Sequence, residues 1–441
     1  MRAGPIAKSI ARQRDCSLLA CWPALVYNGL TCLSFGRVMA TEILECTLPG
    51  AGPVAVRVRP MAINILVGNE QPSYSFDPAG RLIGAFEDGC NYRRALDGRV
   101  LRKWAGPDGR RRQWLSAEES SAFAARVHTF AQEVADTLGD ARVEVLCGWT
   151  AERLAADVAW FSRIYRPVSI LPPDQYLALV IQATEGCSYN RCTFCDFYRD
   201  RPFRIKSPAE LRAHIEEVQA FFGAALGLRK SLFLADANAL VAPMPRIRAW
   251  LDQIDAAGVR RPGGIFSFID AFDVGRKSVA EWAELGARGL RRVYIGMESG
   301  DDALLRFLAK PGTAGDVVEA VRTLKAADVA VSVIIMTGIG GQQFAESHVA
   351  HTVETLNAMP LDEGDIIYFS PFFEQSGSEY AGLAASAGIL PLSSDEVAGQ
   401  EAALRAGLWT GAPGGAKQSR SGGVASRGAQ ISRYDIREFV Y

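Results

Sequence analysis

Three cysteines within nine residues are the side chains of this sequence best suited to chemistry. Cys187, Cys192 and Cys195 lie in Glu185-Gly-Cys-Ser-Tyr-Asn-Arg-Cys-Thr-Phe-Cys-Asp-Phe-Tyr198. Thiolates this close along a chain can converge on one metal centre. The other six cysteines lack such spacing and are interpreted as buried small hydrophobic side chains. They stand at positions 16, 21, 32, 46, 90 and 147.

The number of nearby ligands favours iron and sulfur over zinc. A structural zinc ion normally takes four ligands, often as two spaced pairs, and no fourth cysteine or histidine lies near this segment. The histidines stand at positions 128, 214, 348 and 351. A cube of four irons held by three cysteines leaves one iron open to bind a small molecule. We therefore expect a [4Fe–4S] cluster, with zinc and metal-free cysteines as the alternatives.

The elements that must position these cysteines begin near Tyr176, where strand and helix patterns start to alternate. The six expected strands are Leu177–Ala183, Ser231–Ala235, Gly264–Ile269, Arg292–Met297, Val329–Thr337 and Asp365–Phe369. The helical patterns between them begin near Ser207, Pro243, Ser278, Gly315 and Ala345. Six parallel units predict an open-sided, TIM-like (βα)6 barrel over residues 171–375. The cysteines directly follow its first strand, so they should face the C-terminal ends of the strands, where barrel enzymes hold their active sites.

The cysteine segment and these strands resemble the radical S-adenosylmethionine (radical SAM) superfamily from about Tyr176 to Phe373. The family usually has three residues between its first two cysteines, whereas this chain has four, as some members do. The resemblance implies that the cofactors are a [4Fe–4S] cluster and SAM. It also implies that SAM is cleaved reductively and that the 5′-deoxyadenosyl radical abstracts hydrogen from a substrate. The electron would come from a donor such as flavodoxin or ferredoxin.

The resemblance further predicts a binding site for SAM at the strand ends. It implies that Phe194 and Gly338 lie near the adenine, that Asp236 binds the amino group, and that Glu298 contacts the ribose. The remaining expected members of the site are Asn238, Ser267 and Ser299. As alternatives, Asp236, Asn238 and Glu298 serve only to stabilise the starts of the following helices, and Gly338 belongs to an ordinary turn.

Two groups of basic residues are further candidates for binding an anion. Arg199, Arg201 and Arg204 follow the cysteines, and one of them could neutralise a carboxylate; the alternative is a solvated run of charge. The segment 91–112 interleaves arginines with aromatic residues, a pattern that suits nucleic acid. An exposed hairpin is the alternative interpretation of that segment.

The segments around the barrel have their own patterns. Residues 41–170 predict an α+β accessory domain, with short strands before residue 86 and a helix from Ser116 to Leu138. Residues 376–441 form a C-terminal extension with a loop rich in glycine and serine at 411–428. The extension regains apolar character from Tyr434 to Tyr441, so we expect the end of the chain to dock on the core.

Residues 1–40 do not fit this scheme, because four basic residues precede an apolar stretch from Cys16 to Phe35. That stretch is about as long as a membrane span, but Pro23, Asn28 and Gly29 interrupt it. We expect either an artefactual extension before Met39 or an anchor or targeting peptide, with the former favoured.

The composition limits the classes of partner. The chain has 441 residues, and its 48 basic residues balance 49 acidic ones. Hence no overall field attracts nucleic acid or an anionic membrane. The odd cysteine count and the expected cluster suit the cytoplasm, and no membrane association is expected.

These patterns together predict a radical SAM enzyme that acts on an unidentified substrate. A small molecule is favoured, because the sequence shows no second cysteine cluster and no RNA-binding module. The alternatives are an RNA-modifying radical SAM enzyme and a non-catalytic iron–sulfur regulator or electron carrier.

Overall fold

The computed structural model describes residues 41–107, 109–374, 378–408 and 428–441. The predicted extension 1–40 and nearly all of the Gly/Ser-rich loop therefore lie outside the described residues. Within the described ranges, no helix is both long enough and apolar enough to cross a membrane.

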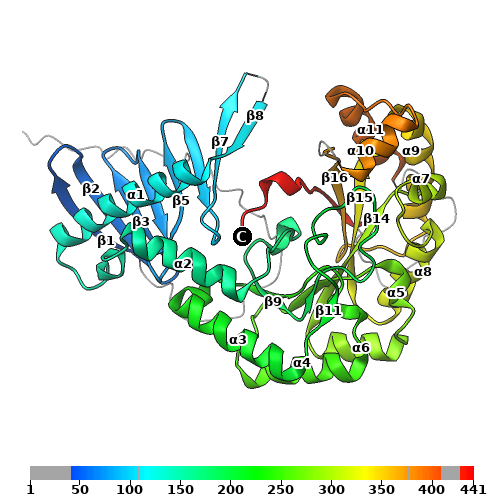
Figure 1. Ribbon diagram of the computed structural model, residues 1–441, viewed down its shortest axis with the longest axis horizontal. Helices are drawn as coiled ribbons and strands as arrows, with labels where there is room; N and C mark the ends of the chain where they lie inside the picture. The colour runs from blue at the N-terminus through cyan, green and yellow to red at the C-terminus, as the bar shows by residue number, and fades with distance from the viewer. Residues whose placement is uncertain (1–40, 108, 375–377, 409–427) are drawn as a thin grey trace, which may run out of the picture. The chain divides into compact units, whose positions relative to one another are not determined.

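The N-terminal part of the chain forms an antiparallel sheet in which eight strands follow one another in sequence order (Figure 1). The strands are β1 (Glu42–Leu48), β2 (Gly52–Arg59), β3 (Ala62–Val67), β4 (Ser73–Phe76), β5 (Leu82–Glu87), β6 (Cys90–Arg94), β7 (Val100–Gly106) and β8 (Gly109–Trp114). Along β2, Val54 and Val56 are buried while their neighbours are more exposed, as expected for a sheet with one covered face. The sheet agrees with the predicted α+β class of this region.

Two helices follow the sheet. Helix α1 (Ala117–Leu138) starts at the predicted capping box, in which Glu119 N donates to Ser116 Oγ at 3.1 Å and Ser116 N donates to Glu119 Oε2 at 2.8 Å. Its buried side chains share one hydrophobic core with the sheet. Helix α2 (Ala151–Ile164) leads from this core toward the second sheet. The start and type of α1 were predicted from the sequence.

The second sheet is parallel and has seven strands in the order β17-β16-β15-β14-β13-β12-β9. They are β9 (Ala178–Gln182), β12 (Ser231–Ala235), β13 (Ile265–Phe268), β14 (Leu290–Glu298), β15 (Ala330–Thr337), β16 (Ile366–Pro371) and β17 (Gln430–Arg433). The first six confirm the predicted strands. The seventh is additional: the four-residue β17 comes from the C-terminal extension and pairs with β16, so the expected count of six was too low.

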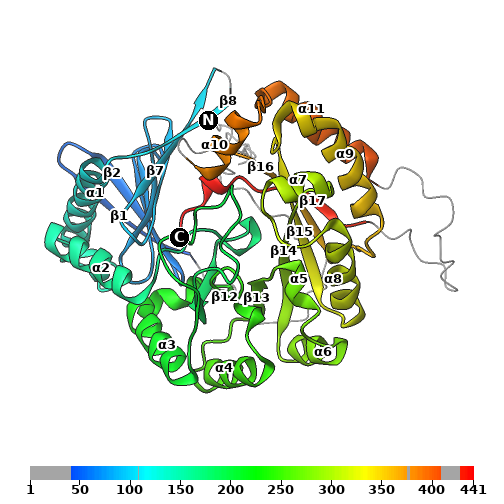
Figure 2. The same ribbon diagram turned by 45° about the vertical axis from the view of Figure 1, so that its right-hand side comes forward.

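Helices surround this sheet along its outer face and at the ends of its strands (Figure 2). They are α3 (Pro208–Phe222), α4 (Met244–Ala256), α5 (Ala271–Val274), α6 (Val279–Ala287), α7 (Asp302–Phe307), α8 (Ala314–Ala326), α9 (Gly341–Asn357), α10 (Glu379–Ser386) and α11 (Ser394–Gly407). Short 3-10 turns lie at Glu144–Leu146, Pro173–Gln175, Gly223–Leu228, Ala239–Val241 and Ile436–Glu438. Capping boxes at Ser207 and Ser278 fix the starts of α3 and α6 close to where the sequence predicted them.

The N-terminal end of the barrel is closed by a buried polar group. Asp174 accepts hydrogen bonds from the hydroxyls of Tyr294 and Tyr368, at 2.6 and 2.8 Å, and from Arg292 at 3.0 Å. These bonds join the segment before β9 to β14 and β16. The opposite end of the barrel, where the strands terminate, is therefore the end at which we expect an active site.

The end of the chain joins β16 to β9, the strand at one edge of the barrel sheet. Tyr434 N donates to Phe369 O of β16 at 2.8 Å, and the Tyr441 hydroxyl accepts from Val180 N of β9 at 3.0 Å. Tyr441 O also accepts from Leu96 N of the accessory region at 2.7 Å. The last eight residues thus dock on the core, as the sequence predicted, and contact both sheets.

Candidate functional site

The three cysteines lie in a loop, residues 186–203, that starts at the C-terminal end of the first barrel strand. Two short antiparallel strands, β10 (Thr184–Glu185) and β11 (Arg204–Ile205), bring its two ends together. We call residues 186–203 the cysteine loop. Cys187, Cys192 and Cys195 are free and partly exposed. Their position at the strand ends is the one that the sequence predicted.

Contacts from three directions fix the path of the cysteine loop. Thr193 N and Thr193 Oγ1 both donate to Leu308 O, at 3.0 and 3.2 Å, which ties the loop to the end of α7. Tyr380 N of α10 donates to Thr193 O at 3.1 Å. Arg199 donates to the carbonyls of Cys192 and Cys195, at 3.0 and 3.3 Å. The loop therefore has a defined shape built partly by elements that are distant in sequence.

The three thiols are partly removed from water, and this desolvation affects their protonation. Desolvation raises the pKa of Cys187, and it raises the pKa values of Cys192 and Cys195 to about 12 and about 11. Cys195 is close enough to Cys187 and Cys192 for their charges to interact. Without metal the thiols are therefore neutral at pH 7, whereas a metal centre deprotonates its coordinating thiols.

Three thiols on the cysteine loop are the donors that could hold a metal centre. Among the described residues, no three Cys, His, Asp or Glu side chains stand close enough to share one metal ion. An iron–sulfur cube separates its three thiolates more widely than a single ion does, because each thiolate binds a different iron. Three soft sulfur donors on one loop therefore suit the [4Fe–4S] cluster that the sequence predicts.

A buried lysine between two carboxylates lies beside the cysteines. Lys310 Nζ is 3.3 Å from Asp270 Oδ1 and 3.6 Å from Glu298 Oε1. The electrostatic field of Lys310 reaches all three thiols. Burial lowers the pKa of Lys310, but the two carboxylates and Cys192 outweigh it and raise this pKa above its usual value. Lys310 is thus a buried cation at the strand ends, which the sequence analysis missed because it follows α7 rather than a strand.

The backbone at Glu298 is arranged to bring its carboxylate to this group. Glu298 has φ +62°, in the left-handed region that is unfavourable for a residue other than glycine, and the pairing of β14 with β15 is irregular there. A side chain at Gly296 would collide with the Glu298 carboxylate, so glycine leaves the space that this carboxylate occupies. Desolvation raises the pKa of Glu298 while Lys310 lowers it, and the net shift is upward.

Asn238 belongs to the same group. It is fully buried, and its Nδ2 donates to Ser188 Oγ of the cysteine loop at 2.9 Å and to Asp273 Oδ2 at 2.7 Å. A longer contact of 3.4 Å reaches Asp270 Oδ2. Its Oδ1 has no partner among the described residues. Asn238 thus offers a free acceptor next to the cysteine loop.

Asp236 follows β12 at the end of the barrel where it was expected, and its carboxylate is bonded to neighbouring groups of the protein. It accepts hydrogen bonds from Gln182 Nε2 at 2.8 Å and from Gly186 N at 3.0 Å, and Arg201 Nε lies 3.4 Å from its Oδ2. These partners belong to β9 and to the cysteine loop. Asp236 therefore lies at the same end of the barrel as the cysteines, and its carboxylate supports the start of their loop.

The other four predicted members of the site, Ser267, Ser299, Gly338 and Phe194, contact neighbouring parts of the protein. Ser267 Oγ donates to Leu234 O at 2.7 Å, and Ser299 Oγ is 2.7 Å from His348 Nδ1; both serines are fully buried. Gly338 has φ +86°, and its N donates to Gln400 Oε1 of α11 at 2.8 Å. Phe194 packs against a small hydrophobic cluster that contains Leu304, Leu308, Ile339 and Tyr380. The structure does not bring the two serines together with the Lys310 group by any hydrogen bond among the described residues.

The basic residues singled out from the sequence mostly have partners within the chain. Arg201 pairs with Asp200 at 2.9 Å, and Arg204 pairs with Glu185 at 2.7 Å. In the segment 91–112, Arg112 pairs with Asp435 at 2.8 Å, and Lys103 lies 3.3 Å from Glu438. These cations hold the chain together, which weakens the case for nucleic acid at this segment.

A comparison with known protein families shows which class of protein part of this chain resembles. Residues 181–354 match the sequence profile of the Radical SAM superfamily. This part of the chain, which includes the cysteine loop, is therefore similar to the radical SAM superfamily, with its subfamily unspecified. No curated protein matches the chain significantly.

Three solved structures illustrate what this chain is similar to. Coproporphyrinogen III oxidase from Escherichia coli is 12% identical, with 52% of each chain covered and a TM-score of 0.39. Methylornithine synthase is 14% identical, covering 61% of this chain and 64% of the other, with a TM-score of 0.34. The cobalamin-dependent S-adenosylmethionine radical enzyme OxsB is 15% identical, covering 52% of this chain and 30% of the other, with a TM-score of 0.34. The matched region spans less than two thirds of each of these proteins.

Proposed function

We propose that this protein cleaves SAM reductively at a [4Fe–4S] cluster held by Cys187, Cys192 and Cys195. The observation that carries the proposal is the convergence of the cysteine loop with Lys310, Glu298 and Asn238 at the strand ends of a matched radical SAM domain. When bound, the cluster supplies one electron to SAM and so generates a carbon-centred radical. The protein must hold the three thiolates, orient SAM and keep water out.

The side chains beside the cysteine loop have complementary roles for an amino-acid cosubstrate. Lys310 is a buried ammonium that suits the carboxylate of SAM, and a charge-assisted pair of this kind is strong in a dry site. Asp270 and Glu298 are acceptors for its amino group or ribose hydroxyls, and Asn238 Oδ1 adds a neutral acceptor. The apolar cluster around Phe194 provides a surface for the flat adenine and excludes water.

Anaerobic reconstitution tests the proposal directly. The wild-type chain should bind about four irons and four sulfides, and with dithionite it should convert SAM to 5′-deoxyadenosine and methionine. Replacing all three cysteines with alanine should remove both the iron and the activity. Replacement of Cys90, a buried cysteine outside the loop, is the matched control and should remove neither. A loaded wild-type protein that never cleaves SAM would instead support a regulator or electron carrier.

We further propose that the substrate is a small molecule and that the reductant is a protein such as flavodoxin or ferredoxin. The internal pairing of Arg112 and Lys103 supports a substrate other than RNA, because it leaves fewer free cations for a phosphate backbone. A reducing compartment such as the cytoplasm suits thiols that must bind an oxygen-sensitive cluster. Filter binding of bulk tRNA across a salt series tests the RNA alternative, and tight salt-dependent binding would favour it.

A further inference from the structure

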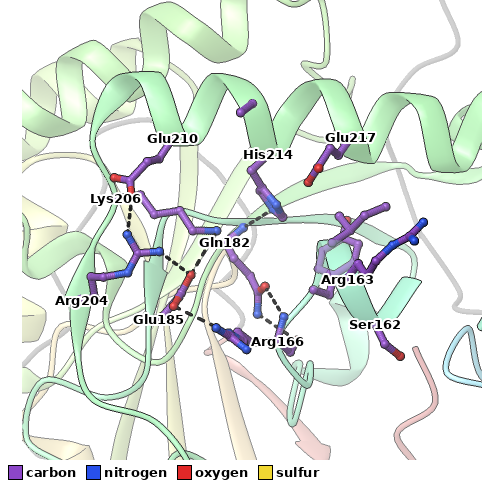
Figure 3. Close-up of a pocket in the computed structure, with 13 residues that line it drawn as sticks. Ser162, Arg163, Arg166, Gln182, Glu185, Arg204, Lys206, Glu210, His214 and Glu217 are labelled. Carbon is purple, nitrogen blue, oxygen red and sulfur yellow. Dashed lines mark hydrogen bonds and ion pairs between the residues drawn. The ribbon is translucent and has the colours of Figure 1, made fainter. Parts of the chain in front are cut away.

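A pocket of about 420 Å³ opens at the base of the cysteine loop, between α2, β9, β11 and α3 (Figure 3). A second pocket of about 380 Å³ shares Arg166, Glu185 and Arg204 with it. Four cations and three glutamates line the first pocket. The cations are Arg163, Arg166, Arg204 and Lys206. So polar a cavity suits a charged ligand rather than an apolar one.

Lys206 is a nearly buried lysine in the wall of the pocket. Its side chain is only 8% exposed, and the carboxylate within ion-pair distance is that of Glu185, whose Oε1 lies 3.7 Å from Nζ. That separation is too long for a hydrogen bond, although an ammonium carries three donors. Desolvation lowers the pKa of Lys206, which reflects the cost of this burial. An acceptor in the pocket would offset that cost.

The carboxylates of the pocket are already shared or committed. Glu185 accepts a hydrogen bond from Arg204 at 2.7 Å and also faces Lys206 and Arg166, whose Nε lies 3.8 Å away. Glu210 caps α3 by accepting from Ser207 N at 2.7 Å, and its other oxygen, Oε1, accepts from Arg204. Figure 3 shows Lys206, Arg204 and Arg166 converging on the one carboxylate of Glu185. With Glu210 also paired to Arg204, two carboxylates face these three cations, and the four cations of the lining exceed its three glutamates by one positive charge.

We infer that this pocket binds an oxyanion of the phosphate class, with Lys206 and Arg166 as its direct contacts. A phosphoryl group has several acceptor oxygens and so satisfies an ammonium and a guanidinium together. The side chain of Arg166 is 63% exposed and free to turn toward a ligand. The volume exceeds what a single phosphate fills, so a phosphorylated small molecule fits as well as the free ion.

The pocket is joined to the cysteine loop by hydrogen bonds. Gln182 Oε1 accepts from Arg166 N at 3.0 Å, and its Nε2 donates to Asp236 Oδ1 at 2.8 Å. Asp236 in turn accepts from Gly186 N, which directly precedes Cys187. Glu185, the carboxylate of the pocket, is the next residue back along the chain. A bound anion therefore contacts residues that support the cluster ligands.

Calorimetric titration of the cluster-loaded full chain with inorganic phosphate, at constant ionic strength against chloride, tests this inference. The wild type should show saturable binding at one site. Lys206→Met should weaken it at least tenfold, which is about 1.4 kcal/mol. The control Lys230→Met changes an exposed lysine outside the pocket and should leave binding unchanged. Glu185→Gln should tighten binding, because it removes the carboxylate that competes with the anion.

Titration with ribose 5-phosphate separates the two sources of the anion. If ribose 5-phosphate binds with a lower Kd than inorganic phosphate, and Lys206→Met abolishes this tighter binding, the pocket is assigned to a phosphate ester. If the two Kd values are equal, the pocket is assigned to the free ion. The inference is overturned if neither compound binds saturably up to ~10 mM, tenfold above a millimolar Kd. It is overturned equally if folded Lys206→Met, checked by circular dichroism, binds phosphate as the wild type does. SAM cleavage is not part of this readout, so the test stands apart from the proposed activity.

Discussion

At the scale of single residues, the site depends on charges that burial makes costly to change. Lys310 is held by two carboxylates, and Glu298 reaches it only through a left-handed backbone and the absence of a side chain at Gly296. Strain of this kind persists only where the surroundings impose it. The arrangement places a cation and two acceptors beside the cysteine loop before any cosubstrate binds.

Glu298→Gln should weaken the binding of SAM while leaving the iron content unchanged. The substitution keeps the shape but removes the charge, and a hydrogen bond to a charged group contributes about 1.5–3 kcal/mol, so roughly tenfold to a hundredfold in Kd is expected. Equilibrium dialysis with SAM on the loaded protein measures it. Glu319→Gln, an exposed carboxylate on α8, is the control. An unchanged Kd in loaded Glu298→Gln would remove this residue from the site.

His128 in the accessory region makes the fold sensitive to acid. Its ring stacks on Trp149 and meets Phe76 edge to face, and neither ring nitrogen has a partner among the described residues. Desolvation, together with Arg94 and Arg153, lowers its pKa to about 3. The unfolded state therefore takes up a proton below about pH 6.5 that the folded state refuses. The stability from neutral His128 is complete above pH 6.5 and declines as the pH falls toward 3.

His128→Phe should remove this pH dependence, because phenylalanine keeps the stacking and cannot be protonated. The free energy of unfolding should rise by about 1–3 kcal/mol, the usual cost of a buried polar group without a partner, and more at pH 5 than at pH 8. Urea unfolding at both pH values measures the effect. An identical loss of stability between pH 8 and pH 5 in the variant and the wild type would show that His128 is not the titrating group.

At the scale of elements, the cysteine loop is held by helices that follow it far along the chain. Thr193 is bonded to the end of α7, and α10 donates to its carbonyl. The Tyr380 hydroxyl accepts from Gly340 N at 3.1 Å, so the same helix also holds the loop after β15. Helix α10 lies beyond the matched region 181–354 and still helps to shape the site. The C-terminal extension is therefore part of the functional unit.

Thr193→Val tests this clamp, because it deletes one hydroxyl and keeps the shape. The loss of the bond to Leu308 O should lower the free energy of unfolding by about 1 kcal/mol. It should also speed the loss of iron to a chelator several-fold, since the loop opens more readily. Thr129→Val, which removes an equivalent bond to Ala125 O on exposed α1, should leave iron loss unchanged. Equal rates of iron loss in both variants would mean that Thr193 only adds stability.

At the scale of the whole molecule, the last residues of the chain complete the barrel. The edge strands β17 and β9 are not paired with each other, and the segment from Tyr434 to Tyr441 runs between them. The Tyr441 hydroxyl satisfies the buried Val180 N on the edge of β9 that faces away from β12. An edge amide that is buried without a partner would be costly. The same segment pairs with the accessory region through Asp435 and Arg112.

Tyr441→Phe should lower the free energy of unfolding by about 1–3 kcal/mol, because it leaves Val180 N without an acceptor. Amide hydrogen exchange should quicken at Val180 in particular, which distinguishes this loss from a general weakening of the fold. The aromatic packing of residue 441 against Phe161 is kept by the substitution. Unchanged exchange at Val180 would show that water replaces the hydroxyl there.

The sequence by itself determined the class of the fold, the place of the three cysteines after the first barrel strand and the type of most elements. These depend on local signals: the period of apolar residues, capping boxes such as Ser116 with Glu119, and the spacing of three cysteines. The carboxyl ends of parallel strands always meet at one end, so Glu298 and Asp236 could be placed beside the cysteine loop without a structure.

Only the tertiary structure decided which of these side chains reach the site. It turned Asp236 toward Gly186, engaged Ser267 and Ser299 in buried hydrogen bonds, and brought Lys310 between Asp270 and Glu298. It also added β17 from beyond a long loop. The physical reason is that the direction of a side chain and the pairing of distant segments depend on packing across the whole core, which no local pattern of residues encodes.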